Sequence, residues 1–155
     1  MKRRARVDST TAAVAVMQAS LRSILPPAHV PLDDAALPFW DSVVAQFARS
    51  EWTAHDLEIA AMLARTMRDV SANQESLAIE GAVLASERGT PVINPRATYL
   101  NTLVGTMEKL RRGLQVDARA RNGEKRDTAQ RRDATKAIEA SNPLDSPLLA
   151  RPTVQ

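Results

Sequence analysis

The chain has 155 residues, a net charge of +3 and no cysteine, which predicts one domain with some tail and excludes disulfide scaffolds, thiolate zinc sites and cysteine nucleophiles. Hydrophobic residues make up 44% and aromatic residues only 3%, which disfavours a large sheet core or a base-stacking platform and favours an Ala- and Leu-rich helical protein. The charge is segregated, because residues 1–6 contribute +4 and residues 109–136 contribute +6, whereas residues 37–108 hold five basic and nine acidic side chains.

Residues 1–32 are predicted to form a basic N-terminal arm, one helix and a proline-rich linker. Ser9 and the threonines after it can cap a helix over residues 9–25, whose apolar stripe is Val14, Met17, Leu21 and Leu25. Prolines between residues 26 and 31 prevent the helix from continuing. The apolar run at residues 12–17 is too short for a secretory signal, and no stretch approaches a membrane span, so we expect no membrane partner.

Residues 33–117 are predicted to form the helical core and oligomerisation domain. Pro38 suits the first turn of a helix within residues 33–50, where most of the rare aromatic side chains gather. Thr53 and Asp56 have the spacing of a capping box, which opens a long helix that Gly81 ends. This N-terminal part is expected to be helix-turn-helix-like, although no helix pair joined by a standard short glycine turn stands out.

The apolar period changes over residues 82–93, which predicts a short β-hairpin confined to an edge by Pro91. Asn94 and Pro95 then cap and open a second long helix. Its leucines repeat for only about two heptads, which indicates a packing helix and not a coiled coil. The side chains expected in the core or between copies are Trp40, Phe47, Leu57, Ala61, Ala64, Leu100, Leu103, Met107, Leu110 and Leu114.

Residues 118–155 are predicted to be a basic and largely disordered tail, because the apolar pattern ends after Val116 and three prolines follow residue 142. A transient helix between Glu124 and Ala140 is compatible with the pattern. Leu144, Leu148 and Leu149 are candidate anchors for a docking partner, with chance occurrence as the plain alternative. The expected fold class is therefore mainly α, with a short hairpin and a long packing helix.

The sequence offers little for catalysis, since it has no glycine-rich phosphate loop, paired-histidine zinc helix or serine elbow. His55 and Glu58 would share one helix face, but two ligands are too few for a stable metal site. We expect no enzyme activity, no metal and no cofactor. A metal-dependent nuclease built on His55, Glu58 and neighbouring carboxylates is the remaining catalytic hypothesis.

The clustered Lys and Arg residues point to DNA, because they neutralise phosphates and release condensed counterions. A solubilising tail is the plain alternative. We expect contacts to the phosphate backbone, since no helix presents an obvious set of base-reading side chains. The predicted contacts are Lys2, Arg3, Arg4, Arg6, Arg111, Arg112, Arg119, Arg121, Lys125 and Arg126, and Arg131, Arg132 and Lys136 extend the same basic run.

Several short motifs, in their order and spacing over residues 37–121, carry a family resemblance. They are Trp40, the helix opening Trp52-Thr53-Ala54-His55-Asp56, Glu80-Gly81, Arg88-Gly89, Asn94-Pro95 and the ending from Leu114 to Arg121. This arrangement resembles the terminase small subunits of tailed bacteriophages.

The resemblance implies a non-catalytic packaging factor of the host cytoplasm, neither secreted nor part of the mature virion. Such a protein would assemble with copies of itself into a ring and bind viral double-stranded DNA. It would deliver that DNA to the terminase large subunit and modulate its ATPase and nuclease. The alternative hypothesis is a small helical DNA-binding transcription regulator.

Overall fold

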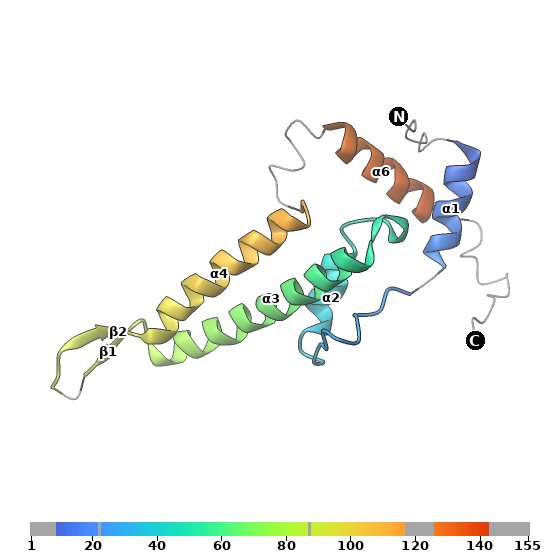
Figure 1. The fold of residues 1–155 in the computed structure, drawn as a ribbon. Helices are drawn as coiled ribbons and strands as arrows, with labels where there is room; N and C mark the ends of the chain where they lie inside the picture. Colours follow the sequence, from blue (N-terminus) through green and yellow to red (C-terminus); the bar gives the residue numbers. More distant parts are fainter. Residues whose placement is uncertain (1–8, 22, 87, 117–125, 143–155) are drawn as a thin grey trace.

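The computed structural model is mainly helical and describes residues 9–21, 23–86, 88–116 and 126–142. Figure 1 shows a broad end, where α1, α2, α6 and the first half of α3 gather, and an arm that projects from it. We define the arm as residues 72–105, in which α3 and α4 run antiparallel up to a small hairpin. None of the described helices is both long and apolar enough to span a membrane.

Helix α1 (Thr10–Ser20) begins as predicted, with the Ser9 hydroxyl accepting a hydrogen bond of 3.3 Å from the Ala12 amide. The helix ends before Leu25, the last residue of the predicted stripe, which is 74% exposed. The prolines that follow disfavour helix in the residues before them. The buried side of α1 is centred on Val16 and Ser20, whereas Val14 of the predicted stripe is exposed.

The junction of α2 (Leu37–Val44) and α3 (Ala54–Glu80) follows the capping chemistry of the sequence. A single 3-10 turn, η1 (Arg49–Glu51), connects them. Thr53 and Asp56 form the predicted capping box, with the Asp56 amide donating to the Thr53 hydroxyl at 3.2 Å. Gly81 ends α3 with φ 87° and ψ 150°, a conformation open only to glycine, as the sequence predicts.

The core lies where α2, the first half of α3 and the end of α4 meet. Its centre contains Trp40, Val43, Leu63, Leu114 and three alanines of α3, all buried. Alanine brings the helices close together because its side chain is small. Of the predicted core residues, the structure buries Trp40, Ala61, Ala64, Leu100 and Leu114 and leaves Phe47, Leu57, Leu103, Met107 and Leu110 partly buried.

The predicted hairpin is present at the end of the arm. Strands β1 (Val83–Ala85) and β2 (Pro91–Ile93) pair antiparallel, with Val83 opposite Ile93. Asn94 then caps α4 (Pro95–Gly113), its side-chain oxygen accepting from the Arg96 amide at 2.9 Å. The same Asn94 side chain donates to the Gly81 carbonyl and to Glu80, at 3.0 and 2.9 Å. Asn94 is only 2% exposed, so it closes the base of the hairpin from the inside.

Helix α6 (Arg126–Ala140) occupies part of the segment predicted to be largely disordered, at the place where a transient helix was compatible with the pattern. The helix packs against α1. Just beyond its last turn, the Asn142 side chain donates to the Ser20 hydroxyl at 2.7 Å and to the Met17 carbonyl at 3.1 Å. Pairing with another element supplies the stability that the sequence of α6 alone lacks.

Candidate nucleic-acid interface

The basic residues predicted to contact DNA are only partly within the described structure. Those of the N-terminal arm, Lys2, Arg3, Arg4 and Arg6, lie outside the described residues, as do Arg119, Arg121 and Lys125. Arg126 is the first residue of α6, and its side chain is not described. Arg111 and Arg112 are therefore the predicted contacts whose side chains can be placed.

Both arginines belong to the last turn of α4, where the carbonyl ends of the helix favour positive charge. Arg111 is half-buried and lines a small cleft of 160 Å³ beside α2, together with Gln46 and Val116. Arg112 is exposed and lies 3.4 Å from Glu108, one turn earlier in the same helix. An exposed ion pair of this kind is weak, because water and salt screen it. Arg112 can therefore leave Glu108 for a phosphate at little cost.

Helix α6 adds a second set of basic side chains to the broad end. Arg131 and Lys136 are exposed. The Arg132 guanidinium carbon lies 4.0 Å from the centroid of the Phe47 ring, and that ring is 5.2 Å from Trp52. Phe47, predicted as a core or interface residue, is half-buried. The face of its ring attracts the positive charge of Arg132.

Arg49 was not among the predicted site residues, yet it connects three elements. Its guanidinium donates to the Ser20 carbonyl at the end of α1 and lies 3.7 Å from Glu139 of α6. Its backbone amide also donates to Glu139 at 3.0 Å. In the sequence Arg49 is an isolated cation in an acidic-leaning segment, and no local pattern distinguishes it.

Glu51 lies in the same polar cluster and has an unusual environment. Burial raises the pKa of its carboxyl, and the nearby Glu139 raises it further, while Arg132 and a hydrogen bond from Ala48 lower it. One buried carboxylate oxygen has no hydrogen-bond partner among the described residues. The ionised form is therefore poorly stabilised here.

His29, His55 and Glu58 form a polar contact between the proline-rich linker and the first turn of α3. The two imidazoles lie 3.1 and 3.4 Å from different oxygens of Glu58. Within the described ranges, no group of three or more histidine and acidic side chains is arranged to hold a metal ion. The arrangement fits a contact that ties the linker to α3.

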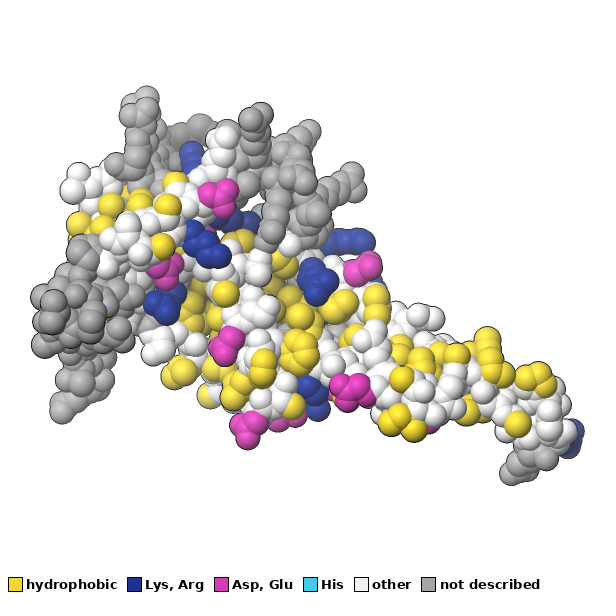
Figure 2. Space-filling model, turned by 180° about the vertical axis from the view of Figure 1, so that it is seen from behind, with side chains coloured by type: hydrophobic (Ala, Val, Ile, Leu, Met, Phe, Trp, Pro, Cys, Tyr) yellow, Lys and Arg dark blue, Asp and Glu magenta, His cyan; other side chains and the backbone are white. Residues whose placement is uncertain are grey.

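The exposed Lys and Arg side chains in Figure 2 lie mainly over the broad end of the molecule, where Asp and Glu side chains are interleaved with them. The arm in the same view is mostly hydrophobic and uncharged, with basic side chains again only near its tip. The large apolar side chains exposed on the arm are Ile79 at 88%, Val83 at 61%, Val92 at 43%, Ile93 at 72% and Tyr99 at 51%. We call these five residues the apolar arm surface. Val83 and Ile93 are paired across the two strands and point to the same face of the hairpin, whereas Val92 points to the opposite face. Large apolar side chains exposed on a projection mark a candidate interaction site.

Two comparisons with known proteins agree with each other. The sequence matches the Hendrixvirinae small terminase family over residues 1–155. It is also 33% identical to the terminase small subunit of Enterobacteria phage HK97 over 155 residues, an alignment that covers 97% of this chain and 96% of that protein.

Proposed function

The chain belongs to the Hendrixvirinae small terminase family, and from this premise we propose that it is the DNA-recognising, non-catalytic component of a phage genome-packaging machine. The family places the chain in phage DNA packaging. We infer that it acts in the cytoplasm of the infected host, assembles with copies of itself and hands viral DNA to the large subunit. The large subunit would supply the ATPase and nuclease.

The contacts to DNA are assigned to the last turn of α4 and to α6, both at the broad end. Arg112, Arg131 and Lys136 are exposed on these two helices. The predicted contacts outside the described residues would add to them, namely Lys2, Arg3, Arg4, Arg6, Arg119, Arg121 and Lys125. Contacts of this kind neutralise phosphates without reading bases. In an assembly each set is repeated, so individually weak contacts act at a high effective concentration.

Self-assembly is assigned to the apolar arm surface. The arm is too narrow to bury these side chains within one chain, since in the described residues its sheet has two strands and every strand residue except the half-buried Leu84 is exposed. A neighbouring copy packed against the arm would remove them from water, and each buried side chain would contribute about 1.5–3 kcal/mol. If the arm of each copy contacts a different surface of the next copy, the repeated head-to-tail contact closes into a ring.

Docking to the large subunit is assigned to Leu144, Leu148 and Leu149. They lie outside the described residues, directly after Asn142, which is anchored to α1. A few apolar residues next to a fixed point suit a short partner-binding segment.

The observation that carries the proposal is that a chain of known family exposes Arg112, Arg131 and Lys136 at its broad end and five large apolar side chains on its arm (Figure 2). The test combines native mass spectrometry with fluorescence anisotropy on a labelled duplex at several salt concentrations. We expect a closed oligomer whose DNA affinity falls steeply with salt. A monomer whose DNA binding does not respond to salt would contradict the proposal.

A matched pair of variants locates the interface. Arg112→Ala with Arg131→Ala and Lys136→Ala should keep the oligomer and lower the salt slope by about 0.9 for each phosphate that the protein no longer neutralises. The control replaces exposed Arg65 of α3 and Arg88 of the hairpin turn by alanine and should leave the slope unchanged. A dimer that protects one short palindrome in footprinting would instead favour a transcription regulator.

A further inference from the structure

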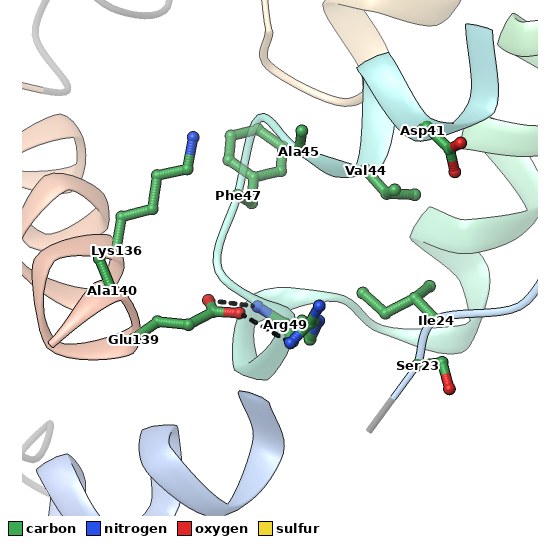
Figure 3. Close-up of a pocket in the computed structure, with 10 residues that line it drawn as sticks. All are labelled: Ser23, Ile24, Asp41, Val44, Ala45, Phe47, Arg49, Lys136, Glu139 and Ala140. Atoms are coloured by element: carbon green, nitrogen blue, oxygen red, sulfur yellow. Dashed lines mark hydrogen bonds and ion pairs between the residues drawn. The ribbon is translucent and has the colours of Figure 1, made fainter. Parts of the chain in front are cut away.

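A groove between α2, the proline-rich linker and α6 is open in the structure (Figure 3). It encloses 560 Å³, within the range of ligand and peptide sites. Ile24, Val44 and the Phe47 ring supply its apolar wall, and α6 contributes Lys136, Glu139 and Ala140. We call this the α2–α6 groove.

Charge is distributed unevenly around the α2–α6 groove. Arg49 and Glu139 neutralise each other within it. Lys136 of α6 and Asp41 of α2 are exposed and stand on opposite sides of the apolar wall (Figure 3). The groove therefore favours a segment with an acidic residue near α6, apolar side chains in the middle and a basic residue near α2.

The chain itself carries a segment of this pattern. After Asn142 the sequence places Asp145, then Leu148 and Leu149, then Arg151. Asn142 is 7% exposed and is bound to Ser20 and Met17, so residues 143–155 start from a fixed point beside the groove that Glu139 and Ala140 line. These thirteen residues can extend for up to about 43 Å, enough to cross it.

We propose that residues 144–151 of the same chain occupy the α2–α6 groove, with Leu148 and Leu149 against Ile24, Val44 and Phe47, Asp145 facing Lys136, and Arg151 facing Asp41. The occupant is a tethered segment of this chain, and tethering raises its effective concentration to the millimolar range without tight intrinsic binding. The groove thus holds the leucines that the proposed function assigns to the large subunit. The regulatory consequence, which rests on that function, is that the large subunit must take them from the groove.

The absence of cysteine makes crosslinking of the full-length chain a direct test. Ala45 lines the groove and is exposed, so the test variant carries Ala45→Cys and Ala150→Cys. The control carries Ala78→Cys, at an exposed alanine of the arm, with the same Ala150→Cys. A short thiol-reactive crosslinker should join the groove pair roughly tenfold faster than the control pair. Equal rates for the two pairs would overturn the proposal.

Charge exchange tests the stated orientation. In the groove pair, Lys136→Glu should lower the crosslinking rate several-fold, and adding Asp145→Lys should restore it. A rate that the single change leaves unaltered overturns the orientation. Denaturing gels distinguish crosslinks within one chain from crosslinks between chains. A band at monomer size supports docking in the same chain. A ladder of linked chains would overturn it, because the segment would then dock on a neighbouring copy.

The last measurement repeats the crosslinking in the presence of purified large subunit. The large subunit should slow crosslinking of the groove pair and leave the control pair unchanged. Fast crosslinking that the large subunit does not slow would overturn the regulatory consequence and leave docking in place. None of these readouts depends on DNA, so they can fail or succeed independently of the proposed DNA binding.

Discussion

At the scale of single residues, the conformation of Gly81 has the sharpest consequence. Its φ of 87° with ψ of 150° lies in a region that only glycine enters without strain. It separates α3 from the hairpin, so the direction of the hairpin depends on it. Replacing its hydrogen with a methyl group must either strain this residue or redirect the hairpin.

We therefore predict that Gly81→Ala lowers the free energy of unfolding by about 1–3 kcal/mol, measured by chemical denaturation. Gly105→Ala is the matched control, because a Cβ there meets no atom within 4 Å and Gly105 lies inside α4. That change should stabilise the helix by about 0.5–1 kcal/mol. Equal effects of the two changes would contradict the role given to Gly81.

Glu51 supports a prediction with the opposite pH dependence from an ordinary carboxylate. Burial, its largest influence, raises the pKa of Glu51 above 4.5 in the folded protein. The folded state therefore binds the proton more tightly than the unfolded state, and stability is lost as pH rises through the folded pKa. Glu51→Gln should raise the melting temperature at pH 7, and the gain should shrink as the pH falls through the raised folded pKa towards 4.5. A melting temperature that falls at pH 7 would show that ionised Glu51 is stabilising.

At the scale of elements, the junction between α3, the hairpin and α4 is held by a polar network. Arg96 binds Glu80 through two nitrogens at 2.7 and 3.0 Å and donates to the Asn73 side chain at 2.9 Å. Asn94, the residue after β2, completes the network by donating a hydrogen bond to Glu80. The hydrogen bonds from Arg96, and then those from Asn94, hold the pKa of Glu80 below 4.5.

Because the pKa of Glu80 is lowered on folding, ionised Glu80 stabilises the folded state above pH 4.5. This stabilisation is lost as the pH falls through the lower pKa of the folded state. We predict that Glu80→Gln lowers the melting temperature at pH 7 and that the difference from the natural protein disappears in strong acid. Amide hydrogen exchange should accelerate in residues 80–96 and stay unchanged in the core at Ala60 to Ala64. Uniform acceleration would mean that the network supports the whole fold.

The sequence predicts elements better than it predicts their contacts. Capping residues at Ser9, Thr53 and Asn94 and the glycine at 81 act locally, so the helix starts and the hairpin follow from nearby residues. The burial of Val16 and Ser20 in place of the predicted stripe of α1 does not follow in this way, because it depends on α6, more than 100 residues later. The role of Arg49 depends on the same distant helix.

At the scale of the whole molecule, mutations should separate DNA binding, assigned to Arg112, Arg131 and Lys136, from self-assembly, assigned to the apolar arm surface. We predict that Ile79→Glu with Ile93→Glu breaks the oligomer into monomers, because carboxylates would have to be buried between copies. Both side chains are exposed in the single chain, so the fold should survive. Analytical ultracentrifugation and circular dichroism measure the two effects. An intact oligomer at micromolar concentration would contradict the assignment of the arm.

Asn94 closes the hairpin at its base, where its side chain donates to Glu80 and Gly81 and its backbone amide donates to Ala82. The residues between positions 82 and 93 can therefore vary in length or sequence while the two helices keep their positions. If copies recognise one another through this projection, relatives with the same helices and different hairpins would sort into separate assemblies when two phages infect one cell. The hairpin would then determine which copies assemble with one another.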